Sequence, residues 1–319
     1  MGGDDKPIKD PDELGGKKGP TFYSADAPPP SVDGQPGGAA GPVKVGTGPA
    51  GARSLKLLSA GAEPREKRVY APKVGSKETM TVSSKTSSSM SAGGQQLPGG
   101  DAGLPPSALE IALVVKEVSD GQIKSDFVVK KASAAAGGGQ EAVQKYAASI
   151  VALKGAKGTV TTTRGGDAIA VEIDEAAGDA NKDALRDALL TPSVPFPSEA
   201  IGEGAKWEIR QPNVSDGLRT EQLTTYELRA LTKGKGKVSM AVRITAPEQD
   251  IEVPGAPATP HLTKLDGSGT GSAAFDLTKV SAQTFTLGTS SKASMTISMM
   301  GTDMAAEMNS RNETKRSGK

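Results

Sequence analysis

The feature that most constrains this chain is an abrupt change in composition, from a start rich in Pro and Gly to long stretches of alternating residues. The early segments, such as 27–30 and 34–38, carry too little apolar surface to offset the entropy of ordering the chain. From about Arg65 onward, Val and Ile alternate with Thr and Ser, as in strands with one buried face. The sequence therefore predicts a disordered Pro/Gly-rich linker or tether over residues 1–64, followed by a β-rich domain.

That domain is predicted to be a single unit over residues 65–308. Roughly 250 residues suit one large β-rich domain better than two. Residues 74–77 and 201–207 each precede a pair of long strand patterns, which indicates two similar β-units that share one sheet. Residues 309–319 are polar and are predicted to form a frayed tail.

Individual elements can be placed from the spacing of apolar residues. The clearest is a hairpin that turns at Asp120 and Gly121, with apolar residues on one face from position 109 to 115 and again from 123 to 129. Helical spacing predicts a helix over about 141–153 and a second over about 182–190.

Two single residues carry further structural predictions. The second helix is expected to be capped by Asp179 or Asn181, because short polar side chains accept hydrogen bonds from the first turn of a helix. Trp207 is the only Trp and lies in an alternating segment. It is predicted to be a buried anchor of the core.

Together these patterns predict a mainly β fold of the α+β class. The expected architecture is a curved antiparallel sheet or half-barrel of about 9–11 strands. Two short helices are expected to cover its concave face or its open end. A sandwich of two sheets is the alternative.

Composition argues against several classes of partner. The net charge of +1 provides no long-range field for nucleic acid, and aromatic residues, at 3%, are too scarce for base stacking. With no Cys, the chain has no disulfide, thiolate metal site or cysteine nucleophile. No apolar run approaches the ~18 residues of a membrane-spanning helix. We therefore expect no nucleic-acid partner and no transmembrane segment.

Two segments resemble known binding loops but depart from them. Residues 179–183 supply the first three oxygen ligands of a calcium loop, yet Ala184 lies where that loop needs Gly and Leu190 where it needs Glu. The start of a helix is the favoured interpretation. Residues 267–271, Gly-Ser-Gly-Thr-Gly, lack the Lys and the following helix of a phosphate loop, and are predicted to be a flexible connection between strands.

The remaining chemical candidates are one His and a group of Met residues. His261 would have to serve a catalytic triad or a histidine metal site alone, and no Gly-x-Ser-x-Gly motif accompanies it. Thioethers can bind Cu(I), but the alternation of apolar residues favours core packing for the group formed by Met295, Met299, Met300, Met304 and Met308. We predict no catalytic, cofactor-binding or metal-binding residues, no cofactor and no enzyme activity.

Two segments resemble a known group of proteins. Residues 73–81, Lys-Val-Gly-Ser-Lys-Glu-Thr-Met-Thr, and residues 195–207, from Pro195 to Trp207, resemble recurring elements of uncharacterised bacterial secreted or lipoprotein β-domains of unknown function. These elements are a Val-x-Gly-Asp-x-aromatic strand start and a Pro…Val-x-x-Gly-x-x-Trp segment. Met80 stands where the family has an aromatic residue. The resemblance extends over about 65–301 and implies an extracytoplasmic β-domain with no assigned reaction or site residues.

The expected function is that of a non-enzymatic cell-envelope protein which binds an apolar ligand or a protein partner. The alternatives are a structural or assembly component of a surface complex, and a hydrolase with an unrecognised carboxylate site. Residues 2–5, Gly-Gly-Asp-Asp, suit the start of a mature lipoprotein with an N-terminal lipid anchor if Met1 replaces a lipidated Cys. This predicts a periplasmic or outer-membrane-anchored location. An ordinary translation start in a cytoplasmic protein is the alternative.

Overall fold

The computed structural model describes residues 43–44, 53–96, 103–135, 141–176, 180–190, 193–215, 218–251, 259–299 and 302–319. Most of the predicted linker, and the candidate cap Asp179, lie outside the described residues. Two strands nevertheless form within the predicted linker. Residues 43–44 pair with residues 170–171, and residues 54–59 pair with the strand that contains Trp207. The boundary predicted at Arg65 is therefore too late.

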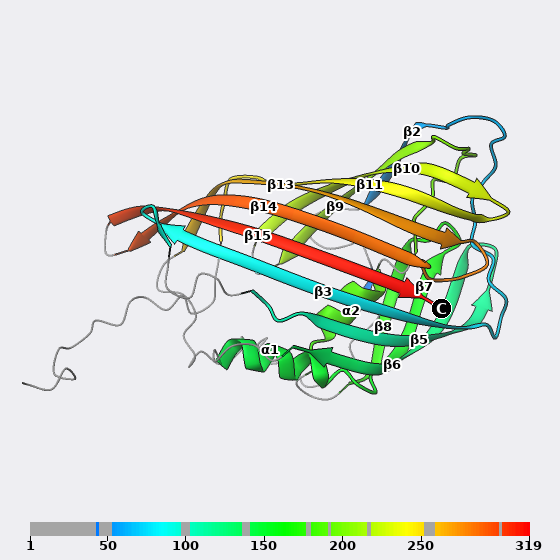
Figure 1. Ribbon diagram of the computed structural model, residues 1–319, viewed down its shortest axis with the longest axis horizontal. Helices are drawn as coiled ribbons and strands as arrows, with labels where there is room; N and C mark the ends of the chain where they lie inside the picture. The colour runs from blue at the N-terminus through cyan, green and yellow to red at the C-terminus, as the bar shows by residue number, and fades with distance from the viewer. Residues whose placement is uncertain are drawn as a thin grey trace, which may run out of the picture.

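Within the described residues, fifteen strands form one antiparallel sheet, and two helices accompany it (Figure 1). The strands are β1 (Val43–Lys44), β2 (Ser54–Ser59), β3 (Lys77–Ala92), β4 (Gln95–Gln96), β5 (Ser107–Val118), β6 (Gln122–Ala134), β7 (Lys157–Thr163), β8 (Ala168–Glu175), β9 (Lys206–Ser215), β10 (Leu218–Thr232), β11 (Lys235–Ala246), β12 (Gln249–Asp250), β13 (Pro260–Asp276), β14 (Thr284–Met299) and β15 (Thr302–Gly318). The helices are α1 (Glu141–Val151) and α2 (Lys182–Leu190).

The strand order is β1-β8-β7-β6-β5-β3-β15-β14-β13-β11-β10-β9-β2, with β12 beside β13 and β4 beside β3. The two ends, β1 and β2, do not pair with each other, so the sheet is not closed. The predicted fold class is confirmed. The strand number exceeds the predicted range partly because three strands, β1, β4 and β12, have only two residues each.

The sheet consists of two successive meanders. The first runs through β3, β5, β6, β7 and β8, and the second through β9, β10, β11, β13, β14 and β15. Each begins with a similar turn, in which Gly75 before β3 and Gly204 before β9 both have a positive φ. The meanders join where β15, the last strand of the second, pairs with β3, the first strand of the first.

The prediction that residues 309–319 form a frayed tail is wrong. Residues 309–318 belong to β15, which lies in the middle of the sheet between β14 and β3. Backbone hydrogen bonds link Thr79 and Lys319 in both directions, so the pairing continues to the last residue. Polarity is a poor guide here, because ladder hydrogen bonds come from the backbone and do not require apolar side chains.

The two helices pack on one side of the first meander, α1 against β6 and α2 against β8 (Figure 1). Asn181 caps α2, since its Oδ1 accepts a hydrogen bond from the backbone N–H of Ala184 at 2.9 Å. Leu185 and Leu189 of α2 and Ile150 of α1 are buried in the main core. The predicted cap at Asn181 is therefore confirmed.

Buried side chains define an inner face of the sheet, and the opposite face is called the outer face below. The main core contains most of the large side chains, among them Trp207, Tyr70, Phe127 and Phe275. A smaller apolar cluster lies toward the other end of the long strands and consists of Ala92, Leu262, Leu265, Ala293, Met295, Ile297 and Ala306. Between the two clusters, the inner face of β3 and β15 carries Ser, Thr and Asn.

The Gly-rich segment 267–271 is an interior part of β13 and not a connection between strands. Its three glycines share the inner face with Met240, Val242 and Ile244 of the neighbouring strand β11. A Cβ atom at Gly269 or Gly271 would collide with backbone oxygens of β14, so close packing of strands explains the glycines at these positions. The prediction of a flexible connection is wrong.

Candidate functional site

A small pocket on the inner face is the best-defined candidate site, and we call it the inner pocket. Its volume is about 110 Å³. It lies where the main core gives way to the polar middle of the sheet, so its walls combine apolar and polar groups. The lining residues are Ser193, Val194, Gln222, Thr224, Tyr226, Met240, Phe285, Leu287, Thr314 and Arg316.

The cationic group of the inner pocket is Arg316 of β15. Only 8% of the residue is exposed, and its guanidinium carbon lies 4.9 Å from the centre of the Phe285 ring, in a cation–π contact. Burial lowers the pKa of Arg316 to about 10, while the neighbouring Tyr226 and Asp187 act in the opposite direction. Arg316 therefore stays charged at neutral pH inside a largely desolvated wall.

The second polar group is the hydroxyl of Tyr226, on β10. Its ring stacks on Trp207 with a centroid distance of 5.5 Å and an interplanar angle of 4°. Burial raises the pKa of Tyr226 to about 12, so the hydroxyl keeps its proton at neutral pH. The hydroxyl makes no hydrogen bond to any described residue, and so it can donate one to a bound group.

A buried hydrogen-bond network fixes the wall formed by Ser193 and Val194. The hydroxyl of Tyr70 donates to the carbonyl of Val194 at 3.0 Å and accepts from its N–H at 3.1 Å. The hydroxyl of Ser193 donates to the carbonyl of Gly166 at 3.1 Å. The wall is thus held by contacts outside the pocket and does not depend on a ligand for its position.

One carboxylate lies near this site. Burial, and then the neighbouring Asp183, raise the pKa of Asp187 on α2, whereas Arg316 and Arg186 act to lower it. Among the described residues, no group of three or more His, Asp or Glu side chains could hold a metal ion.

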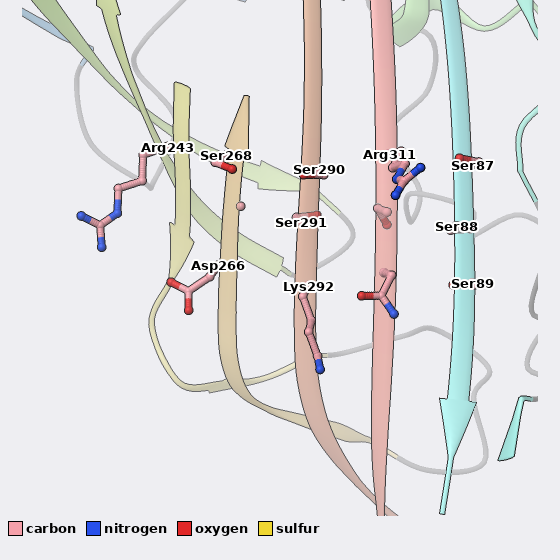
Figure 2. A pocket seen from close by; sticks show the side chains of 13 residues that line it. Ser87, Ser88, Ser89, Arg243, Asp266, Ser268, Ser290, Ser291, Lys292 and Arg311 are labelled. Carbon is pink, nitrogen blue, oxygen red and sulfur yellow. The ribbon is translucent and has the colours of Figure 1, made fainter. Parts of the chain in front are cut away.

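Two shallower hollows, of about 910 and 680 Å³, adjoin on the outer face. Figure 2 shows the larger one, which crosses β3, β15, β14, β13 and β11. Its charged residues lie on the outer face because they alternate with inner-face neighbours, as Arg243 does with Val242 and Lys292 does with Ala293. Ser87, Ser268, Ser290 and Arg311 line both hollows.

The His and the described Met residues that the sequence singled out do not line the inner pocket. His261, on β13, is held at the surface by Asp250 and Glu248. Met295 lies in the smaller apolar cluster and Met308 packs against it, which confirms core packing for these two residues. The side chain of Met299 and all of Met300 lie outside the described residues.

Sequence reasoning missed Arg316, the cation of the inner pocket, because it lies in the segment predicted to fray. The sequence of this segment does contain one indication of a strand. From position 304 to 316, every second residue of β15 except Asn312 is less exposed than its neighbours, and the series begins with Met304, Ala306 and Met308. This period of two is typical of a strand with one buried face.

The environment of His261 leads to a prediction about pH. Hydrogen bonds to Asp250 at 2.7 Å and to Glu248 at 2.9 Å raise the pKa of His261 above its ordinary value. The protonated ring stabilises the pairing of β12 with β13. This contribution is complete below the ordinary pKa of about 6.5 and is lost as pH rises through the raised pKa.

An NMR titration of the single imidazole should therefore give a pKa above about 6.5, and Asp250→Asn should lower it. Asp120→Asn, an exposed change in a distant turn, is the control and should have no effect. A pKa at or below the ordinary value would contradict the prediction.

The comparisons with known proteins identify no family for this chain. No family model matches the chain, and no curated protein matches it. A solved structure, an outer membrane channel from Pseudomonas putida F1, is similar with 9% sequence identity over 78% of this chain and 97% of the channel, at a TM-score of 0.22. A similarity this low carries no argument about function. No helix among the described residues is long and apolar enough to cross a membrane.

Proposed function

We propose that this chain is a non-enzymatic binding protein that holds an amphipathic ligand on the inner face of its sheet. The anionic end of the ligand would pair with the guanidinium of Arg316 and accept a hydrogen bond from Tyr226. The observation that carries the proposal is the inner pocket, which is lined by a buried cation, an unengaged hydroxyl and apolar side chains.

The electrostatics of the pocket favour an anionic group. A guanidinium that is charged and largely desolvated gains from a negative partner, because charge-assisted hydrogen bonds are stronger than neutral ones. A second cation would be repelled at the same position. Asp187 balances part of the charge from the side of α2, so the pocket also tolerates being empty.

The size and walls of the pocket favour an amphipathic molecule over a small ion. Met240, Phe285 and Leu287 supply apolar contact directly beside the charged group. A volume of about 110 Å³ accommodates a headgroup and a few methylene groups but not a complete lipid. The rest of the ligand would extend along the inner face.

We further propose an extracytoplasmic location, with the Pro/Gly-rich start of the chain as a tether. Support comes from the composition of residues 1–42 and from the resemblance of residues 195–207 to bacterial secreted and lipoprotein domains. An N-terminal lipid anchor would apply if Met1 replaces a lipidated Cys.

The test compares three single-chain amphiphiles of equal length, namely decanoate, decyl phosphate and decanol, by isothermal titration calorimetry with delipidated protein. We expect the two anions to bind more tightly than the neutral alcohol. Arg316→Gln should weaken binding of the anions at least tenfold, a change of about 1.4 kcal/mol. It should leave binding of decanol nearly unchanged.

Two further variants keep this test informative. Arg311→Gln removes the same charge from the same strand but on the outer face, so it should not affect binding. Thr314→Leu fills the pocket without a change of charge and should weaken all three amphiphiles. Equal losses for Arg311→Gln and Arg316→Gln, or no binding of any amphiphile to the folded protein, would contradict the proposal.

A further inference from the structure

The two hollows on the outer face form one continuous trough, because they share the four residues Ser87, Ser268, Ser290 and Arg311. The floor is made of small residues, so the long side chains beside it stand above it. These long side chains include the cations Lys85, Arg243, Lys292 and Arg311 and the carboxylates Asp266 and Glu313. We call this feature the outer trough.

Two arginines lie in one row across the trough. The register places Arg311 opposite Ser290, Ser290 opposite Ser268, and Ser268 opposite Arg243. Figure 2 shows the two arginines separated by the strands that carry the serines. Three strand spacings separate their backbones by roughly 14 Å. A ligand with a single anionic group would reach only one of them.

Some charged residues of the trough form ion pairs with neighbouring residues, and others do not. The carboxylate of Asp266 pairs with Lys264 at 2.7 Å, and that of Glu313 pairs with Lys315 at 2.6 Å. Lys292 pairs with Glu307 at 2.8 Å. In contrast, neither Arg243 nor Arg311 forms an ion pair with any residue that the structure describes. The row therefore presents two guanidinium groups with serine hydroxyls between them.

We propose that the outer trough binds an extended acidic polysaccharide. Anionic groups of the polymer would pair with Arg243 and Arg311. The hydroxyls of Ser268 and Ser290, each both a donor and an acceptor, would bond to the sugar hydroxyls between those charges. This site is separate from the inner pocket, because it lies on the opposite face of the same sheet.

The composition of the trough disfavours the other large anions. No aromatic residue is among the described residues that line it, so they offer no stacking platform for the bases of a single-stranded nucleic acid. Stable protein interfaces usually have an aromatic or aliphatic anchor at their centre. Here the one large apolar lining residue, Leu287, belongs by strand alternation to the inner face and also lines the inner pocket.

The test measures the affinity of the full chain for dextran sulfate, with unsulfated dextran and polyglutamate as comparison polymers, at several salt concentrations. We expect dextran sulfate to bind and unsulfated dextran not to bind. The double variant Arg243→Gln/Arg311→Gln should bind dextran sulfate at least tenfold more weakly and show a shallower dependence on salt.

The matched control is Lys56→Gln/Lys130→Gln, which removes two exposed positive charges outside the trough and should change affinity less than twofold. Equal weakening in the two double variants would overturn the proposal, because binding would then follow net charge alone. Absence of binding to dextran sulfate would also overturn it. A further outcome is that polyglutamate binds as tightly as dextran sulfate and loses as much affinity in the double arginine variant. That result would overturn the polysaccharide proposal in favour of an acidic peptide as the ligand.

Discussion

Replacement of Trp207 by Ala is expected to lower the free energy of unfolding by about 3–5 kcal/mol. The side chain is completely buried. It stacks on Tyr226, contacts Phe196 at a centroid distance of 5.8 Å, and donates a hydrogen bond from Nε1 to the carbonyl of Pro195 at 2.9 Å. The Ala variant would lose these contacts and leave both a cavity and a buried carbonyl without its partner.

Chemical denaturation followed by circular dichroism measures this change. Val214→Ala on the same strand is the control, because Val214 is 46% exposed and its truncation should cost within about 0.5 kcal/mol. A loss below about 1 kcal/mol for Trp207→Ala would show that the core does not depend on this residue. The same variant should also weaken amphiphile binding, since Trp207 supports the ring of Tyr226.

Replacement of Glu78 by Ala is expected to destabilise the fold by about 3 kcal/mol. Glu78 is buried at the start of β3, and its carboxylate accepts three hydrogen bonds from the segment between β13 and β14. The donors are the N–H of Val280 at 2.9 Å, the N–H of Ser281 at 3.2 Å and the hydroxyl of Ser281 at 2.8 Å. Removal of the carboxylate leaves all three buried donors without an acceptor.

Thermal and chemical unfolding of Glu78→Ala should be compared with Glu117→Ala, an exposed Glu on β5 whose loss should cost within about 0.5 kcal/mol. The stability of Glu78→Gln should lie between those of the two Ala variants. Its amide oxygen can still accept a hydrogen bond, but its amide nitrogen would face other donors. Similar stabilities for Glu78→Ala and Glu117→Ala would mean that the three hydrogen bonds contribute little.

Local patterns were sufficient for the elements whose partners are close in sequence. The hairpin of β5 and β6, the helix capped by Asn181, and the burial of Trp207 all follow from the spacing of apolar residues and from side-chain chemistry. Such features depend on the period of a strand or a helix, and a single sequence displays that period directly.

The candidate sites could not be predicted in this way, because their residues meet only when the strands pair. The inner pocket brings Ser193 and Tyr226 together with Phe285 and Arg316, from four separate segments of the chain. The outer trough depends on the register that aligns Arg243 with Arg311 across two intervening strands. Neither site is marked by a regular spacing of residues along the sequence.

The sequence by itself determined the β class of this protein and the burial of Trp207, because these depend on alternation and on the placement of one large side chain. It left a half-barrel and a two-sheet sandwich open, and the strand order of the structure decided for one unclosed sheet. Only the tertiary structure decided that β15 occupies the middle of the sheet and that Arg316 is buried. The physical reason is that backbone hydrogen bonds from two long neighbours hold a polar strand in place. The partners of those bonds lie on β3, more than two hundred residues earlier, and on β14.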